Sequence, residues 1–195
     1  MTRPARAHIN LQALQHNFSR VQQAAPDSRI LAIIKANAYG HGLVRVAQSL
    51  PHADAFGVAC VDEAISLREA GFDRRIVLLE GLFTAEDVGL VNGYRLDVVV
   101  HHESQLALLE QGNLLQPLDV WVKLDTGMHR LGFAIEDIDA VTERLQQIPR
   151  LGTIRYMSHF PCADDPASDS TTIQSRVFRD AVAATGAEQT LANSA

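Results

Sequence analysis

Short apolar runs alternate with amphipathic helical segments along this chain, and the alternation restricts the possible folds more than any other feature of the sequence. Neighbouring parallel strands need a crossover connection, which is usually a helix. A strictly alternating pattern therefore predicts a parallel sheet. Most of the runs are apolar throughout, as expected for strands covered on both faces. We expect strands at residues 30–34, 55–59, 76–79, 96–100, 118–124, 153–157 and 189–192, and a brief strand at 7–9 before them.

This strand spacing predicts an α/β fold, a (β/α)8 barrel of the TIM type that is incomplete and contains about seven βα units. An open doubly wound sheet remains the structural alternative. Asn10 is suited to cap the first helix, because its side chain accepts a hydrogen bond from a backbone N–H group of the first turn. Helices are expected at 11 to about 26, 43–50, 61–70, 85–91, 103–110, 136–147 and 172–184, with a surface loop at 160–170.

Length and charge exclude several functional classes. The 195 residues suffice for one domain with a full core, and we expect that domain to span residues 1–195. A net charge of −6 without any basic stripe argues against nucleic acid or an anionic membrane as the main partner. The histidines lack metal-ligand spacing, so no metal site is predicted. Cys60 and Cys162 lack a disulfide framework and are expected to be free thiols. Without a signal peptide or transmembrane run, a cytoplasmic enzyme is the default.

Lys35 is the residue with the most informative position. It ends the apolar run 30–34 and opens the segment 35–42, whose sequence is KANAYGHG. A lysine at the mouth of a parallel sheet loses solvent, so its pKa falls and its amine becomes a nucleophile for a carbonyl group. The same placement suits an imine with pyridoxal phosphate (PLP). For a lysine taken alone, a surface position at a strand end is the ordinary interpretation.

Later strand ends also carry polar groups. A barrel enzyme collects its active-site groups at the C-terminal ends of the strands. Taken singly, a strand-end histidine is more often structural, and Asn-Ser is more often a turn or a helix cap. The polar groups at strand ends are Lys35, Asp125 with loop 126–130, Ser158 with His159, and Asn193 with Ser194. Because all of these groups follow strands at the same end, we expect them to face one shared cavity.

Four segments of the chain together resemble alanine racemase, a fold-type III PLP enzyme, and the resemblance extends over essentially the whole chain. Two of the segments are long and specific, 32–42 (AIIKANAYGHG) and 123–132 (KLDTGMHRLG). The other two, 158–160 (SHF) and 193–195 (NSA), are short and count because they fall in the right order and spacing.

The resemblance implies roles for individual residues in the interconversion of L-alanine and D-alanine. Lys35 matches the lysine that forms the internal aldimine with PLP and handles the D-alanine α-proton on one face of the substrate. Arg130 matches the arginine that contacts the phenolic oxygen of the cofactor and the substrate carboxylate. Lys123 matches a lysine that is carbamylated in many members and holds that arginine. A cationic Lys123 would repel Arg130, whereas a carbamate would be an anionic acceptor for it.

Four further residues are implied to bind the cofactor. Tyr39 and Ser194 match ligands of the phosphate, and Asn193 lies beside the second of them. His159 matches a histidine in the hydrogen-bond chain around the pyridine ring. The cofactor chemistry explains these residue types, because PLP acts as an electron sink and racemisation needs a proton acceptor on one face and a donor on the other.

The resemblance also exposes a difference in length. Alanine racemases are about twice as long, act as homodimers, and have an eighth strand and a C-terminal β-domain. That domain supplies a tyrosine of the partner subunit as the opposite-face base. We therefore expect this chain to be a C-terminally truncated barrel without the second base, inactive alone. In the whole enzyme, D-alanine would serve peptidoglycan synthesis or alanine catabolism.

Other functions remain open at this stage. A non-catalytic, PLP-binding homeostasis barrel is the main alternative, because such single-domain proteins are nearer to this length. Related two-domain decarboxylases fit the motifs less well. An aldolase-like Schiff-base barrel would keep Lys35 but give Tyr39, Arg130 and Ser194 no common purpose.

Overall fold

The computed structural model of the protein describes residue 4 and residues 6–193, and it contains two compact units, Met1–Val77 and Leu78–Ala195. In both units strands alternate with helices, and seven strands occur in the part of the chain that is described. The strand pairs β1–β2, β4–β5, β5–β6 and β6–β7 are all parallel. Parallel pairing with helical connections is the arrangement that the sequence pattern predicts.

The first unit holds three strands, which stand in the order β1-β2-β3. Strand β2 is buried at all four positions, because helices cover it and its neighbours are strands. Asn10 caps the first helix as predicted, since its Oδ1 accepts a hydrogen bond from the backbone N–H of Ala13 at 3.0 Å. The elements are α1 (Leu11–Ala24), β1 (Leu31–Ile33), α2 (Lys35–Tyr39), α3 (Leu43–Ser49), β2 (Ala55–Val58), α4 (Val61–Glu69) and β3 (Arg75–Leu78), the last ending at the boundary.

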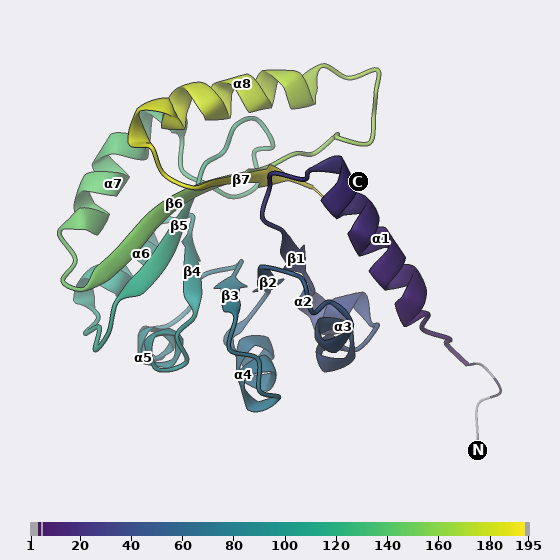
Figure 1. Ribbon diagram of the computed structural model, residues 1–195. Coiled ribbons are helices and arrows are strands. Elements are labelled where there is room, and N and C mark those ends of the chain that lie inside the picture. Colours follow the sequence, from purple (N-terminus) through teal and green to yellow (C-terminus); the bar gives the residue numbers. More distant parts are fainter. Residues whose placement is uncertain (1–3, 5, 194–195) are drawn as a thin grey trace. The chain divides into compact units, whose positions relative to one another are not determined.

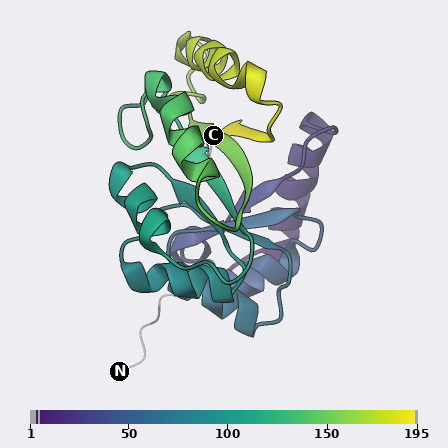
Figure 2. The same ribbon diagram turned by 90° about the vertical axis from the view of Figure 1, so that its left-hand side faces the viewer.

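The second unit holds four strands in the order β4-β5-β6-β7, and helix α7 packs against the long strand β6 (Figures 1 and 2). Strand β4 is fully buried, which explains its run of valines. The elements are α5 (Ala85–Gly93), β4 (Asp97–Val100), α6 (Glu103–Gln111), β5 (Leu118–Lys123), a 3-10 turn (Ile135–Asp137), α7 (Ile138–Gln146), β6 (Leu151–His159), α8 (Ser170–Val182), a second 3-10 turn (Ala183–Thr185) and β7 (Gln189–Ala192).

The strand predicted at residues 7–9 is wrong. These residues lie in irregular backbone, and Ala7 and His8 are exposed. A strand exists only where a neighbour completes its hydrogen-bond ladder, and no strand of the described chain pairs with this segment. The other predicted strands and helices are present with small shifts of their ends.

Two smaller predictions can also be compared with the structure. Cys60 and Cys162 are free thiols, as expected. Among the described residues, no helix combines the length and apolar character that crossing a membrane requires.

The strands of the second unit have two chemically different faces. Side chains alternate between the faces of a strand, and the register places Trp121 beside Arg155 and Val122 beside Tyr156. Tyr156 points to the helices, because its hydroxyl lies 2.9 Å from Thr142 Oγ1 of α7. Trp121 and Arg155 therefore point to the opposite face, which we call the inner face. On strand alternation it includes Asp97, Val99, Asp119, Trp121, Lys123, Arg155, Met157 and His159.

The inner face contains a buried ion cluster around Arg155, whose side chain is only 6% exposed. Its guanidinium donates to Asp119 Oδ2 at 2.8 Å and to Glu188 Oε2 at 2.5 Å, and it lies 3.8 Å from Asp97 Oδ2. It also lies over the ring of Trp121, whose Nε1 donates to Asp97 Oδ2 at 2.9 Å. Arg155 of β6 thus connects side chains from β4 and β5 with Glu188, the residue before β7.

Candidate active site

Lys35 follows β1 after one residue, Ile34, and is half-buried. The backbone N–H of Ile34 donates to Gly57 O at 2.8 Å, so the ladder between β1 and β2 continues up to the residue before Lys35. The lysine therefore stands at the C-terminal end of its strand, where parallel βα folds place functional groups.

The backbone after Lys35 forms a left-handed turn, which the sequence analysis did not predict. Ala36, Asn37, Ala38 and Tyr39 have φ values of 53°, 55°, 53° and 51°. L residues pay about 1–2 kcal/mol each for this conformation, although asparagine tolerates it better. Gly40, with φ at 84°, ends the turn at a position where glycine has no such penalty. Strain of this kind persists only where the surroundings impose it, and it clusters at functional sites.

Arg130 lies in a loop that joins the end of β5 to Phe133. The loop is closed by two backbone hydrogen bonds of 2.9 Å, from Asp125 N to Phe133 O and from Phe133 N to Lys123 O. Arg130 is exposed, so its guanidinium is accessible to an anionic ligand. At Gly132 the φ is +132°, and a Cβ there would lie 2.6 Å from Asp125 N, so only glycine fits without a backbone shift.

Asp125 organises the same loop. Its Oδ1 accepts hydrogen bonds from Gly127 N at 2.9 Å and His129 N at 3.0 Å, and its Oδ2 lies 3.2 Å from His129 Nδ1. Burial alone would raise the pKa of this carboxyl, but the hydrogen bonds from the backbone N–H groups of His129 and Gly127 outweigh it. The pKa of Asp125 consequently lies below its ordinary value, and the carboxylate stays ionised. The loop that carries Arg130 is thereby held in one shape.

Lys123 is the last residue of β5, and His101 follows the end of the neighbouring strand β4. His101 was not a predicted site residue. Its Nε2 lies 3.1 Å from both Glu80 O and Gln105 Nε2, and its Nδ1 is buried without a partner among the described residues. Burial lowers the pKa of His101, the Glu80 carbonyl opposes this, and the charge of Lys123 lowers the pKa further. A neutral imidazole therefore stands beside the end of β5.

The remaining predicted residues lie at the ends of β6 and β7. His159 is the last residue of β6, and it stands in register with Ala192 of β7. Asn193 follows directly, so His159 and Asn193 lie at the C-terminal ends of adjacent strands. Ser194 lies outside the described residues. Ser158, also noted in the sequence, points to the other face and shares a 2.7 Å hydrogen bond with Thr126 Oγ1.

Each unit by itself groups part of the predicted set. Lys35 and Tyr39 are separated only by the left-handed turn in the first unit, and Tyr39 is 55% exposed. Lys123, Arg130, His159 and Asn193 lie at or after the C-terminal ends of β5, β6 and β7 in the second unit. Lys35, Arg130, His159 and Asn193 thus lie at or just after strand ends that the sequence analysis names.

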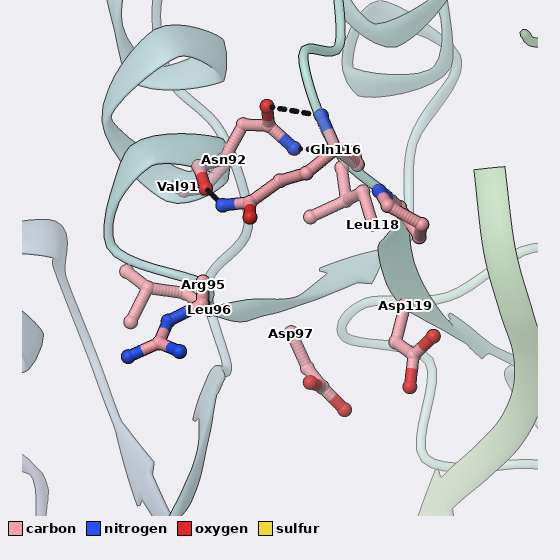
Figure 3. Close-up of a pocket in the computed structure, with 9 residues that line it drawn as sticks. Val91, Asn92, Arg95, Leu96, Asp97, Gln116, Leu118 and Asp119 are labelled. Atoms are coloured by element: carbon pink, nitrogen blue, oxygen red, sulfur yellow. Dashed lines mark hydrogen bonds between the residues drawn. The ribbon is translucent and has the colours of Figure 1, made fainter. Parts of the chain in front are cut away.

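A pocket in the second unit lies at the other end of the strands (Figure 3). It is lined by residues around the starts of β4 and β5, including Asp97 and Leu118. Each of its two amide side chains donates to the backbone carbonyl of the other residue: Asn92 Nδ2 to Gln116 O at 2.8 Å, and Gln116 Nε2 to Asn92 O. The pocket is thus distant along the strands from Lys123, and it is not our candidate site.

Comparison with known proteins defines the family. The family described as "Alanine racemase, N-terminal domain" matches residues 9–195. Alanine racemase of Shewanella baltica is 48% identical over 191 residues, which cover 97% of this chain and 53% of that protein. The biosynthetic alanine racemase of Pseudomonas aeruginosa has a similar structure, with a TM-score of 0.87 and 38% identity over 94% of this chain and 52% of that one. A histidine racemase of Leuconostoc mesenteroides also matches, with a TM-score of 0.84, 26% identity, and coverage of 94% and 51%.

Fold and strand-end residues together define a barrel-type α/β protein with a half-buried lysine at the end of its first sheet strand. The chain belongs to the alanine racemase family, within the N-terminal domain of that family. The prediction of an incomplete (β/α)8-type barrel is confirmed by the parallel βα units and by the similarity to alanine racemase structures. The chain spans about half the length of the curated relatives that it matches.

Proposed function

We propose that this chain provides the cofactor-binding part of a PLP-dependent alanine racemase that interconverts L-alanine and D-alanine. The observation that carries the proposal is Lys35, half-buried at the end of β1 and followed by a strained turn that leads to Tyr39, in a chain of the alanine racemase family. Strain beside a nucleophilic amine is difficult to explain as a purely structural feature.

The residues present fit PLP chemically. The cofactor has an aldehyde, an anionic phenolic oxygen and a phosphate, and the strand ends offer an amine, a guanidinium, a phenol and an amide. Bound PLP supplies an electron sink that makes the α-proton of an amino acid removable. We assign Lys35 to hold the cofactor through Nζ and to move the α-proton on one face of the substrate. Arg130 would bind the phenolic oxygen and the substrate carboxylate with its fixed fork of donors.

The other assignments follow the same logic. Tyr39, Asn193 and Ser194 would donate hydrogen bonds to the phosphate, and His159 would extend the hydrogen-bond chain on the pyridine side. From the family we also propose a homodimer in the cytoplasm that supplies D-alanine for peptidoglycan or degrades alanine. Support for these points is the family membership and the named activity of the Shewanella relatives.

We propose that Lys123 is carbamylated and holds Arg130. Lys123 ends β5, and the loop that carries Arg130 is bonded to its carbonyl through Phe133 N. Two cations here would repel each other, whereas a carbamate would accept hydrogen bonds from the guanidinium. The mass of the native protein should include one carbamate, lost in a Lys123→Gln variant. A plain amine at Lys123 in native protein at neutral pH with bicarbonate would refute the idea.

The cofactor assignment can be tested directly because the chain has only two lysines, Lys35 and Lys123. Borohydride reduction of PLP-loaded protein should attach the cofactor to the peptide that contains Lys35. Lys35→Ala should lose this adduct entirely, and Lys123→Gln should keep it. Attachment at Lys123, or none in the wild type, would contradict the proposal.

A second measurement distinguishes a racemase from a protein that binds PLP without catalysing a reaction. L-Alanine incubated in deuterated water should exchange its α-proton for deuterium and appear in the D form only if the protein is a racemase. A protein that traps PLP on Lys35 but leaves the α-proton in place would be a carrier.

A further inference from the structure

The left-handed turn after Lys35 has an external restraint that comes from helix α4. The backbone N–H of Asn37, at the centre of the turn, donates to Glu63 Oε1 at 2.8 Å. Hydrogen bonds inside the turn, such as Gly42 N to Asn37 O at 2.9 Å, result from the conformation itself and do not select it. The contact with Glu63 reaches the turn from a residue 26 positions away.

The same carboxylate also binds the end of the neighbouring strand. Glu63 Oε2 accepts a hydrogen bond of 2.9 Å from the backbone N–H of Ala59, just after β2. One anion therefore bridges the exits of β1 and β2 through two charge-assisted hydrogen bonds, which are about twice as strong as neutral ones. Its position in the first turn of α4 also favours a negative charge.

Asn37 is restrained on its other side as well. Its Oδ1 accepts a hydrogen bond of 2.8 Å from Leu43 N, the first residue of α3. The side chain thus anchors the end of the turn to α3, while the backbone N–H is held by Glu63. The turn is fixed between two helices that are themselves packed on each other.

An ordinary acidic residue at a helix start would be a simpler explanation for Glu63, since such residues stabilise helices through the dipole. Asp62 occupies the same turn of α4 and serves that purpose equally well. Glu63 differs because both of its oxygens bind backbone outside α4.

We propose that Glu63 is a positioning residue for the cofactor site. Its carboxylate holds the left-handed turn, and the turn sets the spacing between Lys35 and Tyr39. The consequence for PLP rests on the proposed function, whereas the restraint of the turn does not.

Glu63→Gln tests the proposal because glutamine has the same shape but only one acceptor oxygen, so one of the two N–H groups faces an amide NH2. In the full-length, cofactor-free protein, we expect the backbone amide of Asn37 to exchange its hydrogen about tenfold faster in this variant than in the wild type. The dissociation constant of PLP, from an absorbance titration, should rise by about tenfold. Glu63→Asp, which keeps the charge but shortens the reach, should have the same two effects.

Asp62→Asn is the matched control, because it removes one charge from the same helical turn without touching the segment 36–39. It should leave both measurements within about twofold of the wild type. Equal exchange at Asn37 in the wild type and in both Glu63 variants would overturn the proposal. So would an unchanged PLP affinity in a Glu63 variant whose turn exchanges faster. If the wild type does not bind PLP, the proposed function fails, while the exchange measurement still decides whether Glu63 holds the turn.

Discussion

Replacing Arg155 with methionine should lower the free energy of unfolding by about 3 kcal/mol. Methionine keeps an apolar stem of similar reach but removes the buried cation that lies beside Asp97 and Asp119. Breaking a buried ion pair from one side costs about 3–5 kcal/mol. We expect the lower end, because the Glu188 side chain is 38% exposed and can return to water. Urea denaturation of the purified protein measures the change.

Arg144→Met provides the comparison. Arg144 of α7 also contacts two carboxylates, Glu103 at 2.6 Å and Glu110 at 2.8 Å, but its side chain is 41% exposed. Exposed ion pairs contribute at most about 1 kcal/mol. Similar losses in the two variants would mean that the burial of Arg155 has no energetic consequence, contrary to our interpretation of the cluster.

Gly132→Ala should cost about 2–4 kcal/mol of unfolding free energy. Two effects combine at this position: a φ of +132° that L residues rarely adopt, and a Cβ that would meet the backbone at Leu124 C, 2.7 Å away, and at Asp125 N. Backbone atoms cannot move aside as a flexible side chain can. The loop that carries Arg130 must therefore change shape, and thermal or urea unfolding should show the loss.

Gly127→Ala separates the two effects in the same loop. Gly127 has nearly the same φ, +133°, but the three atoms nearest to its Cβ would all belong to the side chain of Gln174, at 3.3 Å or more. We expect it to lose about 1–2 kcal/mol, the conformational part alone. If Gly127→Ala were as harmful as Gly132→Ala, close backbone approach would not explain why glycine is needed at 132.

Much of the fold follows from local sequence pattern. The valines of β4 lie on both faces of the strand and are all buried, so this strand could be recognised without tertiary information. The positions of Lys35, Lys123 and His159 follow in turn, because each stands at the end of a recognisable apolar run.

Features that depend on distant partners could not be predicted. Ala36 and Ala38 carry no signal for a left-handed turn, and the conformation is held by Glu63, far along the chain. The sequence around Arg155 does not indicate that its side chain is buried, because its acidic partners come from three other segments. The segment 7–9 shows the reverse case: an extended-looking run with which no strand of the described residues pairs. The turn, the ion cluster and the segment 7–9 all depend on contacts between residues far apart in the sequence, which a local pattern does not contain.

The turn beside Lys35 also has a meaning in terms of chirality. Its φ values are those of a helical turn reflected in a mirror, the path that D residues follow without strain. Four consecutive L residues are therefore held in the geometry of the opposite enantiomer. Two of the four are alanine, the smallest chiral residue, which keeps the clash of the side chain with the backbone as small as an L residue allows. The backbone that leads from Lys35 to Tyr39 is thus a stretch of four consecutive residues of inverted handedness, next to helices that are right-handed.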